Sequence, residues 1–107
     1  MNIIIEDFKK LDIRIGKILS AEPIDGSERL LKLQVDFGEF QRQILSGIAK
    51  FYKPEELVGK QCPFLVNLEP RTMMGIESQG MLVAVDVQDN AILLHPDKEM
   101  PEGSRIK

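Results

Sequence analysis

The sequence of 107 residues has one cysteine, one histidine, one tyrosine and no tryptophan. The single cysteine, Cys62, excludes an intrachain disulfide, and its apolar neighbours Phe64 and Leu65 predict a packed and unreactive thiol. The single histidine, His95, has neither cysteines nor clustered carboxylates beside it, so it lacks the ligands of a zinc site. We therefore expect no disulfide, no redox chemistry and no bound metal.

Long apolar runs are also missing. The longest, residues 81–85, is far shorter than the roughly 20 residues that a membrane helix needs. The N-terminus lacks the basic and then apolar pattern of a secretion signal, which predicts a cytoplasmic protein. A chain of this length with 43% hydrophobic residues can bury one core, so we expect a single domain over residues 1–107.

Basic charge is not in excess, because the net charge is −3. Nucleic-acid binders usually neutralise phosphates with a surplus of lysine and arginine, so this balance counts against such a partner. The distribution of charge makes a nucleic-acid partner only slightly more plausible, since residues 42–85 are weakly basic between acidic ends.

The usual signs of catalysis are absent too. The chain has no nucleophile with a nearby histidine, no glycine-rich phosphate loop and no acid pair at a recognisable spacing. Glu69 and Glu77 are expected to be solvated loop charges or local partners of Arg71. The sequence therefore predicts a non-catalytic binding protein without a cofactor.

Alternating apolar residues predict the first two strands. Ile13 and Ile15 alternate with polar residues up to Gly16, where the apolar phase shifts, as expected for a long curved strand with a bulge or bend at the glycine. Residues 31–36 alternate strictly between leucine or valine and a polar residue, which predicts one buried and one solvated face.

A hairpin is predicted from residue 31 to residue 46, and its register depends on the turn. A three-residue loop at 38–40 pairs Leu33 with Leu45. One exposed face then carries Lys32, Arg42 and Ser46. A two-residue turn would shift the register by one and move Arg42 to the apolar face. Because burying a charge is costly, the longer loop is favoured.

The remaining elements suggest a fold class. Pro54 and the acids after it begin a short helix that Gly59 ends, and further strands are predicted at 61–68, 81–87 and 91–95. A turn at 101–103 is predicted before residues 105–107. The pattern predicts an all-β fold, a five-stranded barrel of the oligonucleotide-and-oligosaccharide-binding (OB) type with a short helix between strands 3 and 4 and terminal extensions. Another small β-barrel or sandwich fits about equally well.

Polar and flexible residues are concentrated in residues 67–81, between two apolar strands. Lys32, Arg42 and Arg71 could neutralise phosphates, and backbone oxygens or ribose hydroxyls could bond to Ser46, Asn67 and Ser78. A solvated surface explains the same residues about equally well. The methionines of this segment fit either an adaptable contact surface or core filler. Since few aromatic residues are available for stacking, any RNA bound is expected to be folded.

Six ordered blocks of the sequence resemble the tRNA-binding domain family. The resemblance covers roughly residues 7 to 107, and its blocks are 12–18 (DIRIGKI), 30–36 (LLKLQVD), 42–49 (RQILSGIA), 54–60 (PEELVGK), 67–71 (NLEPR) and 75–81 (GIESQGM). Members of this family occur at the C-terminus of methionyl-tRNA synthetases and as small stand-alone proteins.

The resemblance implies a barrel that recognises folded tRNA by its shape, has no catalytic step and forms a homodimer through its terminal segments. A methionyl-tRNA synthetase catalytic chain is a further expected partner. Contacts with tRNA are carried over to Lys32, Arg42, Ser46, Asn67, Arg71, Ser78 and Met81. The dimer contact is expected at terminal apolar residues without an obvious core partner: Ile4, Phe8, Leu93 and Ile106.

Two other functions fit the same residues. One branch of the family resembles export chaperones that bind unfolded polypeptide through the same barrel, and a methionine-rich segment with net acidity suits that function. A structural domain that docks onto a synthetase is also compatible.

Overall fold

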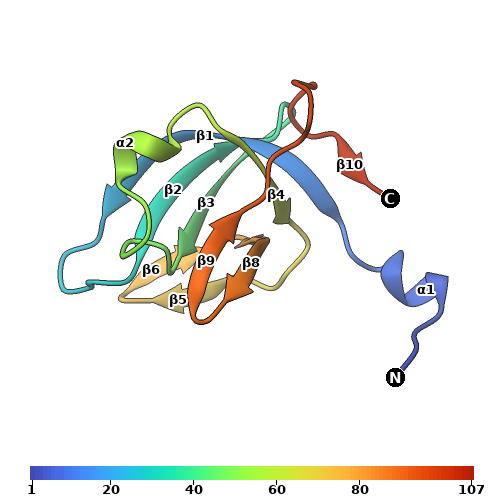
Figure 1. Cartoon of the computed structure of the whole chain (residues 1–107), viewed down its shortest axis with the longest axis horizontal. Helices are drawn as coiled ribbons and strands as arrows, with labels where there is room; N and C mark the ends of the chain where they lie inside the picture. The colour runs from blue at the N-terminus through green and yellow to red at the C-terminus, as the bar shows by residue number, and fades with distance from the viewer.

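The computed structural model describes residues 1–107, and its strands curl into a nearly closed barrel (Figure 1). Its elements are α1 (Ile5–Phe8), β1 (Ile13–Pro23), β2 (Leu31–Asp36), β3 (Gln41–Ser46), α2 (Pro54–Leu57), β4 (Gln61–Leu65), β5 (Arg71–Met73), β6 (Ile76–Ser78), β7 (Met81–Leu82), β8 (Ala84–Val87), β9 (Asn90–Leu93) and β10 (Arg105–Ile106). The main sheet has the order β3-β2-β1-β4-β7, and β10 pairs with β1. The prediction of an all-β barrel with a short helix between strands 3 and 4 is confirmed.

The first strand organises the barrel, because it pairs antiparallel with β2, β4 and β10. Its register against β2 shifts between Ile18 and Ser20, so the bulge lies after the predicted position at Gly16. Gly16 is needed for packing, because a Cβ there would come 2.5 Å from Val35 Cγ1 and 2.6 Å from Phe37 Cε1. The glycine lets β1 pass close to the core.

The β2–β3 hairpin has a two-residue turn, so the predicted three-residue loop is wrong. The backbone N–H of Phe37 donates to the carbonyl of Phe40 at 2.9 Å, which leaves two residues in the turn. Leu33 consequently lies opposite Ile44, and not opposite Leu45. A shift of one residue turns every side chain of β3 to the face opposite the predicted one.

The corrected register separates three residues that were predicted to share a face. Arg42 lies opposite Val35 and Ser46 opposite Leu31, both on the side of the core, whereas Lys32 lies on the outer side. This register places the charge of Arg42 on the side of the core, where burial is costly. That cost is offset here, because Arg42 is only half-buried and its guanidinium donates to backbone carbonyls.

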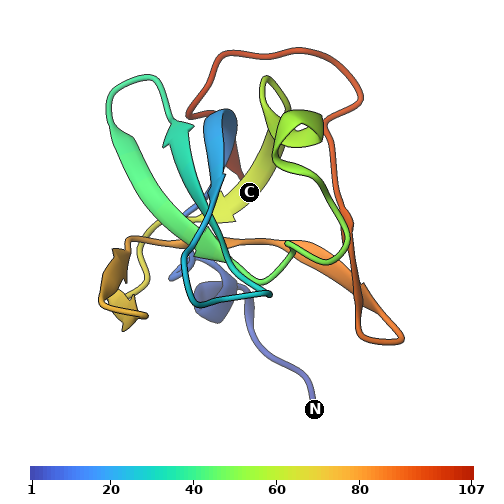
Figure 2. The same cartoon turned by 90° about the vertical axis from the view of Figure 1, so that its left-hand side faces the viewer.

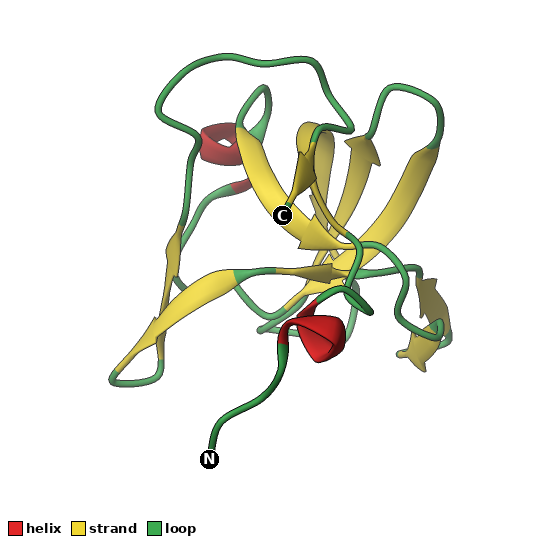
Figure 3. Cartoon of the chain, turned by 90° about the vertical axis from the view of Figure 1, so that its right-hand side faces the viewer, coloured by secondary structure: helices red, strands yellow, loops and turns green.

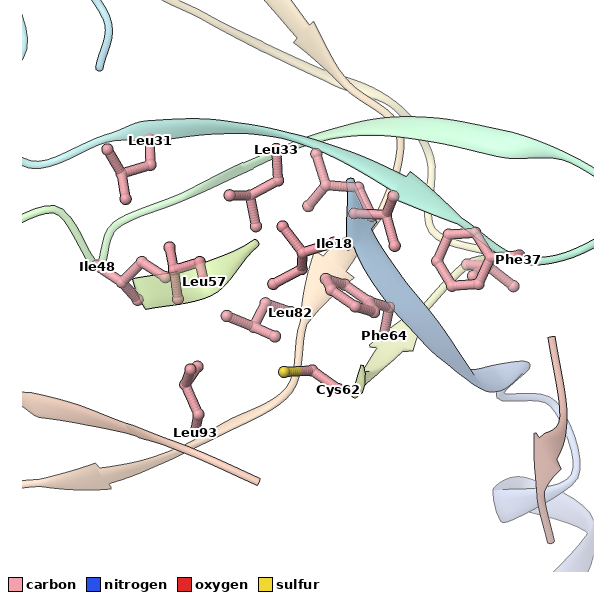
Figure 4. Close-up of a cluster of buried hydrophobic side chains, with 13 residues drawn as sticks. Ile18, Leu31, Leu33, Phe37, Ile48, Leu57, Cys62, Phe64, Leu82 and Leu93 are labelled. Atoms are coloured by element: carbon pink, nitrogen blue, oxygen red, sulfur yellow. The ribbon is translucent and has the colours of Figure 1, made fainter. Parts of the chain in front are cut away.

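Thirteen buried side chains form the main core inside the barrel. Figure 4 shows Ile18 and Leu33 gathered with Phe64 between the strands. Phe37 lies at one side of this group, and its ring meets that of Phe64 edge to face at a centroid distance of 5.6 Å. Cys62 is buried, so the prediction of a packed cysteine is confirmed, and burial raises the pKa of its thiol to about 11.

The second half of the chain differs in detail from the prediction. Residues 67–81 are not a plain loop, because β5 and β6 form an antiparallel hairpin within them. The predicted strand at 61–68 ends at Leu65, and the predicted strand at 81–87 is divided into β7 and β8. The short helix α2 is confirmed, and Gly59 follows it with a φ of +90°. Neither helix is long and apolar enough to cross a membrane.

Two hairpins, β5–β6 and β8–β9, form sheets of their own outside the main sheet. Figure 2 shows them on opposite sides of the barrel, β5–β6 on the left and β8–β9 on the lower right.

The C-terminal segment closes one end of the barrel beside β1 (Figure 3). The N–H of Gly103 donates to the carbonyl of Ile15 at 2.7 Å. A Cβ at Gly103 would collide with the carbonyl oxygen of Phe37, and one at Gly38 would come 2.7 Å from the carbonyl oxygen of Glu102. Both glycines have a positive φ, +91° and +84°. Only glycine fits these two positions without strain.

Candidate nucleic-acid interface

The β5–β6 hairpin is fastened to the edge of β3 by hydrogen bonds from backbone and side chains. Gln43 donates its side-chain Nε2 to the carbonyl of Glu77 at 2.8 Å, and its backbone N–H donates to Oε1 of Gln79 at 2.9 Å. The N–H of Gln79 returns a bond to the Gln43 carbonyl at 2.8 Å. The N–H of Leu45 donates to the hydroxyl of Ser78 at 3.0 Å. The hairpin therefore has a fixed position on the barrel.

A second apolar cluster, outside the barrel interior, supports the same hairpin. Ile24, Leu30 and Leu45 are buried in it, and Met73 and Ile76 of the hairpin pack against them. Met73 is thus a packing side chain, one of the two alternatives open for the methionines of this segment.

The outer side of the hairpin is polar and exposed. Thr72 and Glu77 are direct partners on this outer face, and both are exposed. Arg71 is exposed as well, at the start of β5 on the same face as Met73, and it takes part in none of the ion pairs of the chain. At the tip, Met74 has a φ of +53° and a side chain that is 53% exposed. Arg71 is an unpaired cation on a fixed ribbon, which suits an anionic partner.

Two of the seven predicted contacts, Ser78 and Asn67, are committed inside the molecule. Ser78 is buried, accepting from Leu45 and donating to the carbonyl of Gly80 at 3.1 Å. The amide of Asn67 accepts from the N–H of Asp12 at 2.9 Å and donates to the carbonyl of Lys10 at 2.7 Å. Both side chains hold the fold together. The hydroxyl of Ser78 is buried and not free for a ligand, whereas Asn67 is exposed and its Nδ2 has a second N–H.

Arg42 is committed in part, through one of its three guanidinium nitrogens. Its Nη1 donates to the carbonyls of Val66 and Gln79, both at 3.2 Å, and its guanidinium carbon lies 4.6 Å from the centre of the Phe40 ring. It joins β3 to the segments that follow β4 and β6. A change of charge at Arg42 would therefore disturb the barrel as well as any bound partner.

Lys32 lies on the outer face of β2, where its amine is 3.5 Å from a carboxylate oxygen of Glu22. Ser46 and Met81 are brought together elsewhere, in a groove of about 370 Å³ that Phe51 also lines. Met81 is 44% exposed and Phe51 39% exposed. Phe51 was not among the predicted contacts, because nothing in its sequence neighbourhood distinguishes it from a core aromatic residue.

The seven predicted contacts therefore do not form one continuous face. Arg71, Met81 and Lys32 are accessible, Ser46 is half-buried in the groove, and Ser78 is buried. Arg42 and Asn67 use part of their polar atoms in internal hydrogen bonds.

The residues predicted for a dimer contact have different environments. Leu93 is 8% exposed and belongs to the main core, so the premise that it has no core partner is wrong. Ile4 and Ile106 are exposed, and Phe8 and Ile106 line a cavity of about 490 Å³ between α1 and β10.

The chain matches the model of a family described as "Putative tRNA binding domain" over residues 13–105. Among curated proteins it is 56% identical over 102 residues to methionine–tRNA ligase of Methanothrix thermoacetophila, covering 95% of this chain and 15% of the ligase. It is 53% identical over 104 residues to the ligase of Archaeoglobus fulgidus, covering 97% of this chain and 16% of that protein. The chain thus spans about one sixth of these relatives.

Solved structures of related proteins have the same fold as this chain. A MetRS-related protein from Pyrococcus horikoshii superposes with a TM-score of 0.95 at 39% identity, covering 100% of this chain and 99% of that one. The chaperone CsaA from Bacillus anthracis superposes with a TM-score of 0.90 at 34% identity, covering both chains fully (100% each). The matching family is a binding domain, in agreement with the prediction of a non-catalytic protein. Because the family model matches most of the chain, residues 13–105, this protein belongs to the putative tRNA-binding domain family.

Proposed function

We propose that the chain is a non-catalytic module that binds tRNA by shape and phosphate contacts. The observation that carries the proposal is the β5–β6 hairpin, which is fixed to β3 and carries the exposed, unpaired Arg71 at the start of β5. A rigid ribbon with a free guanidinium can follow an RNA backbone without reading bases. The family match supports the identity of the RNA.

The relatives suggest where such a module works. They are methionine–tRNA ligases much longer than this chain, so it would serve as a C-terminal domain or subunit of a methionyl-tRNA synthetase in the cytoplasm, or as a stand-alone protein. In either setting a weak tRNA contact raises the effective concentration of tRNA near a tethered catalytic domain.

We also propose that the working form is a homodimer. Ile3, Ile4 and Ile5 are exposed beside the cavity that Phe8 and Ile106 line. The outer face of the β8–β9 hairpin adds Val85, Val87 and Ile92, which are 40%, 46% and 46% exposed. Apolar surface of this kind is buried when two copies associate. The predicted contacts Ile4, Phe8 and Ile106 remain part of this proposal, whereas Leu93 does not.

The test is tRNA binding by the purified chain across a salt series, with Arg71→Gln as the variant. Each lost phosphate contact should lower the slope of log K against log salt by about 0.9, so the variant should bind more weakly and depend less on salt. Lys98→Gln, which removes an exposed charge from the segment between β9 and β10, is the matched control. Salt-independent binding, or equal slopes for all three proteins, would contradict phosphate-led recognition through the hairpin.

A second candidate function is the capture of unfolded polypeptide. The groove with Met81 and Phe51 is mostly apolar, and chaperones named CsaA share the fold. A denatured peptide added to the salt series distinguishes the two functions. Tight peptide binding without tRNA binding at low salt would replace the first proposal with the second.

A further inference from the structure

Three arginines converge at the end of the barrel where β1 pairs with β10, on the right in Figure 1. Arg14 donates Nε and Nη2 to the two carboxylate oxygens of Asp12, at 2.9 and 3.1 Å. Arg105 Nε lies 3.3 Å from Asp12 Oδ1. Arg42 is the third, and the ring of Phe40 lies 5.4 Å from the guanidinium carbon of Arg14 and 4.6 Å from that of Arg42.

This arrangement costs free energy, because Arg14 and Arg105 are direct partners across the β1–β10 ladder. Like charges directly opposite each other destabilise a sheet. Asp12 stays ionised, since the hydrogen bond from Arg14 and the attraction of Arg14, Arg105 and Arg42 lower its pKa against the opposing effect of burial. Glu39 adds a further negative charge near Arg14. Three guanidinium groups thus face two carboxylates, which leaves the cluster positive.

Several donors of these arginines are unused. Nη1 of Arg14, Nε and Nη2 of Arg42, and both Nη atoms of Arg105 make no hydrogen bond within the chain. No buried side-chain nitrogen lacks a partner, so the unpaired nitrogens of Arg14 and Arg42 are open to solvent. The side chain of Arg105 is 45% exposed. Guanidinium groups fixed in this way match the geometry of a phosphate.

We propose that Arg14, Arg42 and Arg105 form a phosphate-binding site that holds a backbone phosphate of the bound RNA. The site rests on the proposed function for the source of the phosphate, and it adds a contact at the end of the barrel, apart from the β5–β6 hairpin. The internal hydrogen bonds of Arg42 favour phosphate binding, because a side chain that is already held by carbonyls loses little conformational freedom when the phosphate binds.

The site adjoins the proposed dimer contact, because Arg105 also lines the cavity that Phe8 and Ile106 line. Successive side chains of a strand point to opposite faces, so the side chains of Arg105 and Ile106 leave β10 in opposite directions.

The experiment uses the full chain with tRNA and two variants that change the charge of the cluster in opposite directions. Arg105→Gln removes one guanidinium and should lower the affinity about tenfold and the salt slope by about 0.9. Glu39→Gln removes the nearby negative charge of an exposed turn residue and should raise the affinity severalfold. Lys98→Gln and Glu99→Gln make the same two changes in the segment between β9 and β10, and should leave the affinity unchanged.

A separate arm with inorganic pyrophosphate distinguishes this site from the proposed function. Pyrophosphate should shift the side-chain NMR signals of Arg14 and Arg105 in the unaltered chain, and the shift of Arg14 should weaken in Arg105→Gln. If the unaltered chain binds tRNA but both cluster variants behave like their controls, the site is wrong and the proposed function stands. If the chain binds no tRNA, the proposed function fails. The absence of any pyrophosphate shift would then overturn the site as well.

Discussion

The two hairpins outside the main sheet, β5–β6 and β8–β9, have the same plan and opposite surfaces. Each joins two short strands by a two-residue turn in the left-handed region, and each packs its inner side against the barrel. The outer side of β5–β6 carries Thr72 and Glu77, with Arg71 exposed at the start of β5, whereas the outer side of β8–β9 carries Val85, Val87 and Ile92. One barrel thus presents a polar ribbon and an apolar ribbon on opposite sides, suited to different partners.

The anchors of the two hairpins differ as well. The polar ribbon is held by Ser78, a buried hydroxyl that accepts from Leu45, and by the side chain of Gln43. The apolar ribbon is held mainly by core packing of Leu93, with one bond from its N–H to the hydroxyl of Tyr52 at 3.2 Å. The ribbon that we assign to RNA is therefore the one fixed more firmly by polar contacts.

The largest expected effect comes from adding one acidic residue to either ribbon. Ile92→Asp should weaken the homodimer at least about 100-fold, because a carboxylate would be buried in the contact. Thr72→Asp, the same change on the polar ribbon, should leave dimerisation intact and weaken tRNA binding by repelling phosphates. Sedimentation equilibrium and a tRNA titration measure the two properties. If Ile92→Asp remains dimeric, the apolar ribbon is not the contact.

A pair of hydroxyl deletions compares the anchors. Ser78→Ala should destabilise the fold by about 1–3 kcal/mol, because it leaves the N–H of Leu45 unpaired in the interior. Tyr52→Phe should cost less, about 0.5–1.5 kcal/mol, since Tyr52 is only half-buried. Urea unfolding of both variants measures the difference. An equal loss of stability would show that burial does not distinguish the two anchors.

A smaller effect is expected from the turns. Asp89 has a φ of +67° without being glycine, whereas Gly75 occupies the equivalent place in the polar ribbon with a φ of +75°. Asp89→Gly should stabilise the chain by up to about 1 kcal/mol and Gly75→Ala should destabilise it by a similar amount, because a Cβ is disfavoured in this region. Thermal unfolding of both variants tests the opposite signs. Two shifts of the same sign would contradict this explanation.

The smallest effect lies outside both ribbons, at Asp12. Its pKa is lowered in the folded chain, chiefly by the hydrogen bond from Arg14. Its ionised form therefore stabilises the fold above the ordinary value of 3.8, and this contribution is lost as the pH falls through the lower folded value. Urea midpoints between pH 7 and about pH 3 should fall for the unaltered chain. The midpoints of Asp12→Asn should fall less over the same pH range. If the midpoints of the two proteins fall equally, the ionisation of Asp12 does not contribute to the loss of stability.

The predictions that succeeded came from strong periodic patterns. The alternation of residues 31–36 gave a strand with one buried face, and Pro54 and Gly59 marked the ends of α2. These signals are local, because each residue reports its own position in an element. The hairpin register was wrong for the opposite reason, since Arg42 is tolerated on the inner face only through carbonyls of Val66 and Gln79, far away in the sequence.

The candidate site was harder to predict than the fold. Asn67 and Ser78 look like ligands in a polar segment, and the sequence cannot show that their polar atoms bond to Asp12, Lys10, Leu45 and Gly80. Arg71 has the same kind of sequence neighbourhood and yet remains free. What separates them is tertiary pairing between distant segments, which no local pattern records.

The pairing of β1 with β10 has a consequence for synthesis on the ribosome. Ile13, near one end of the chain, lies opposite Ile106, near the other. A contact between such distant residues forms late, because the chain between them must first be ordered. The hairpins can form as the chain emerges, but the arginine-lined end of the barrel can be completed only after Arg105 and Ile106 have left the exit tunnel. A ribosome stalled before Arg105 should therefore carry a nascent chain with this end of the barrel still open.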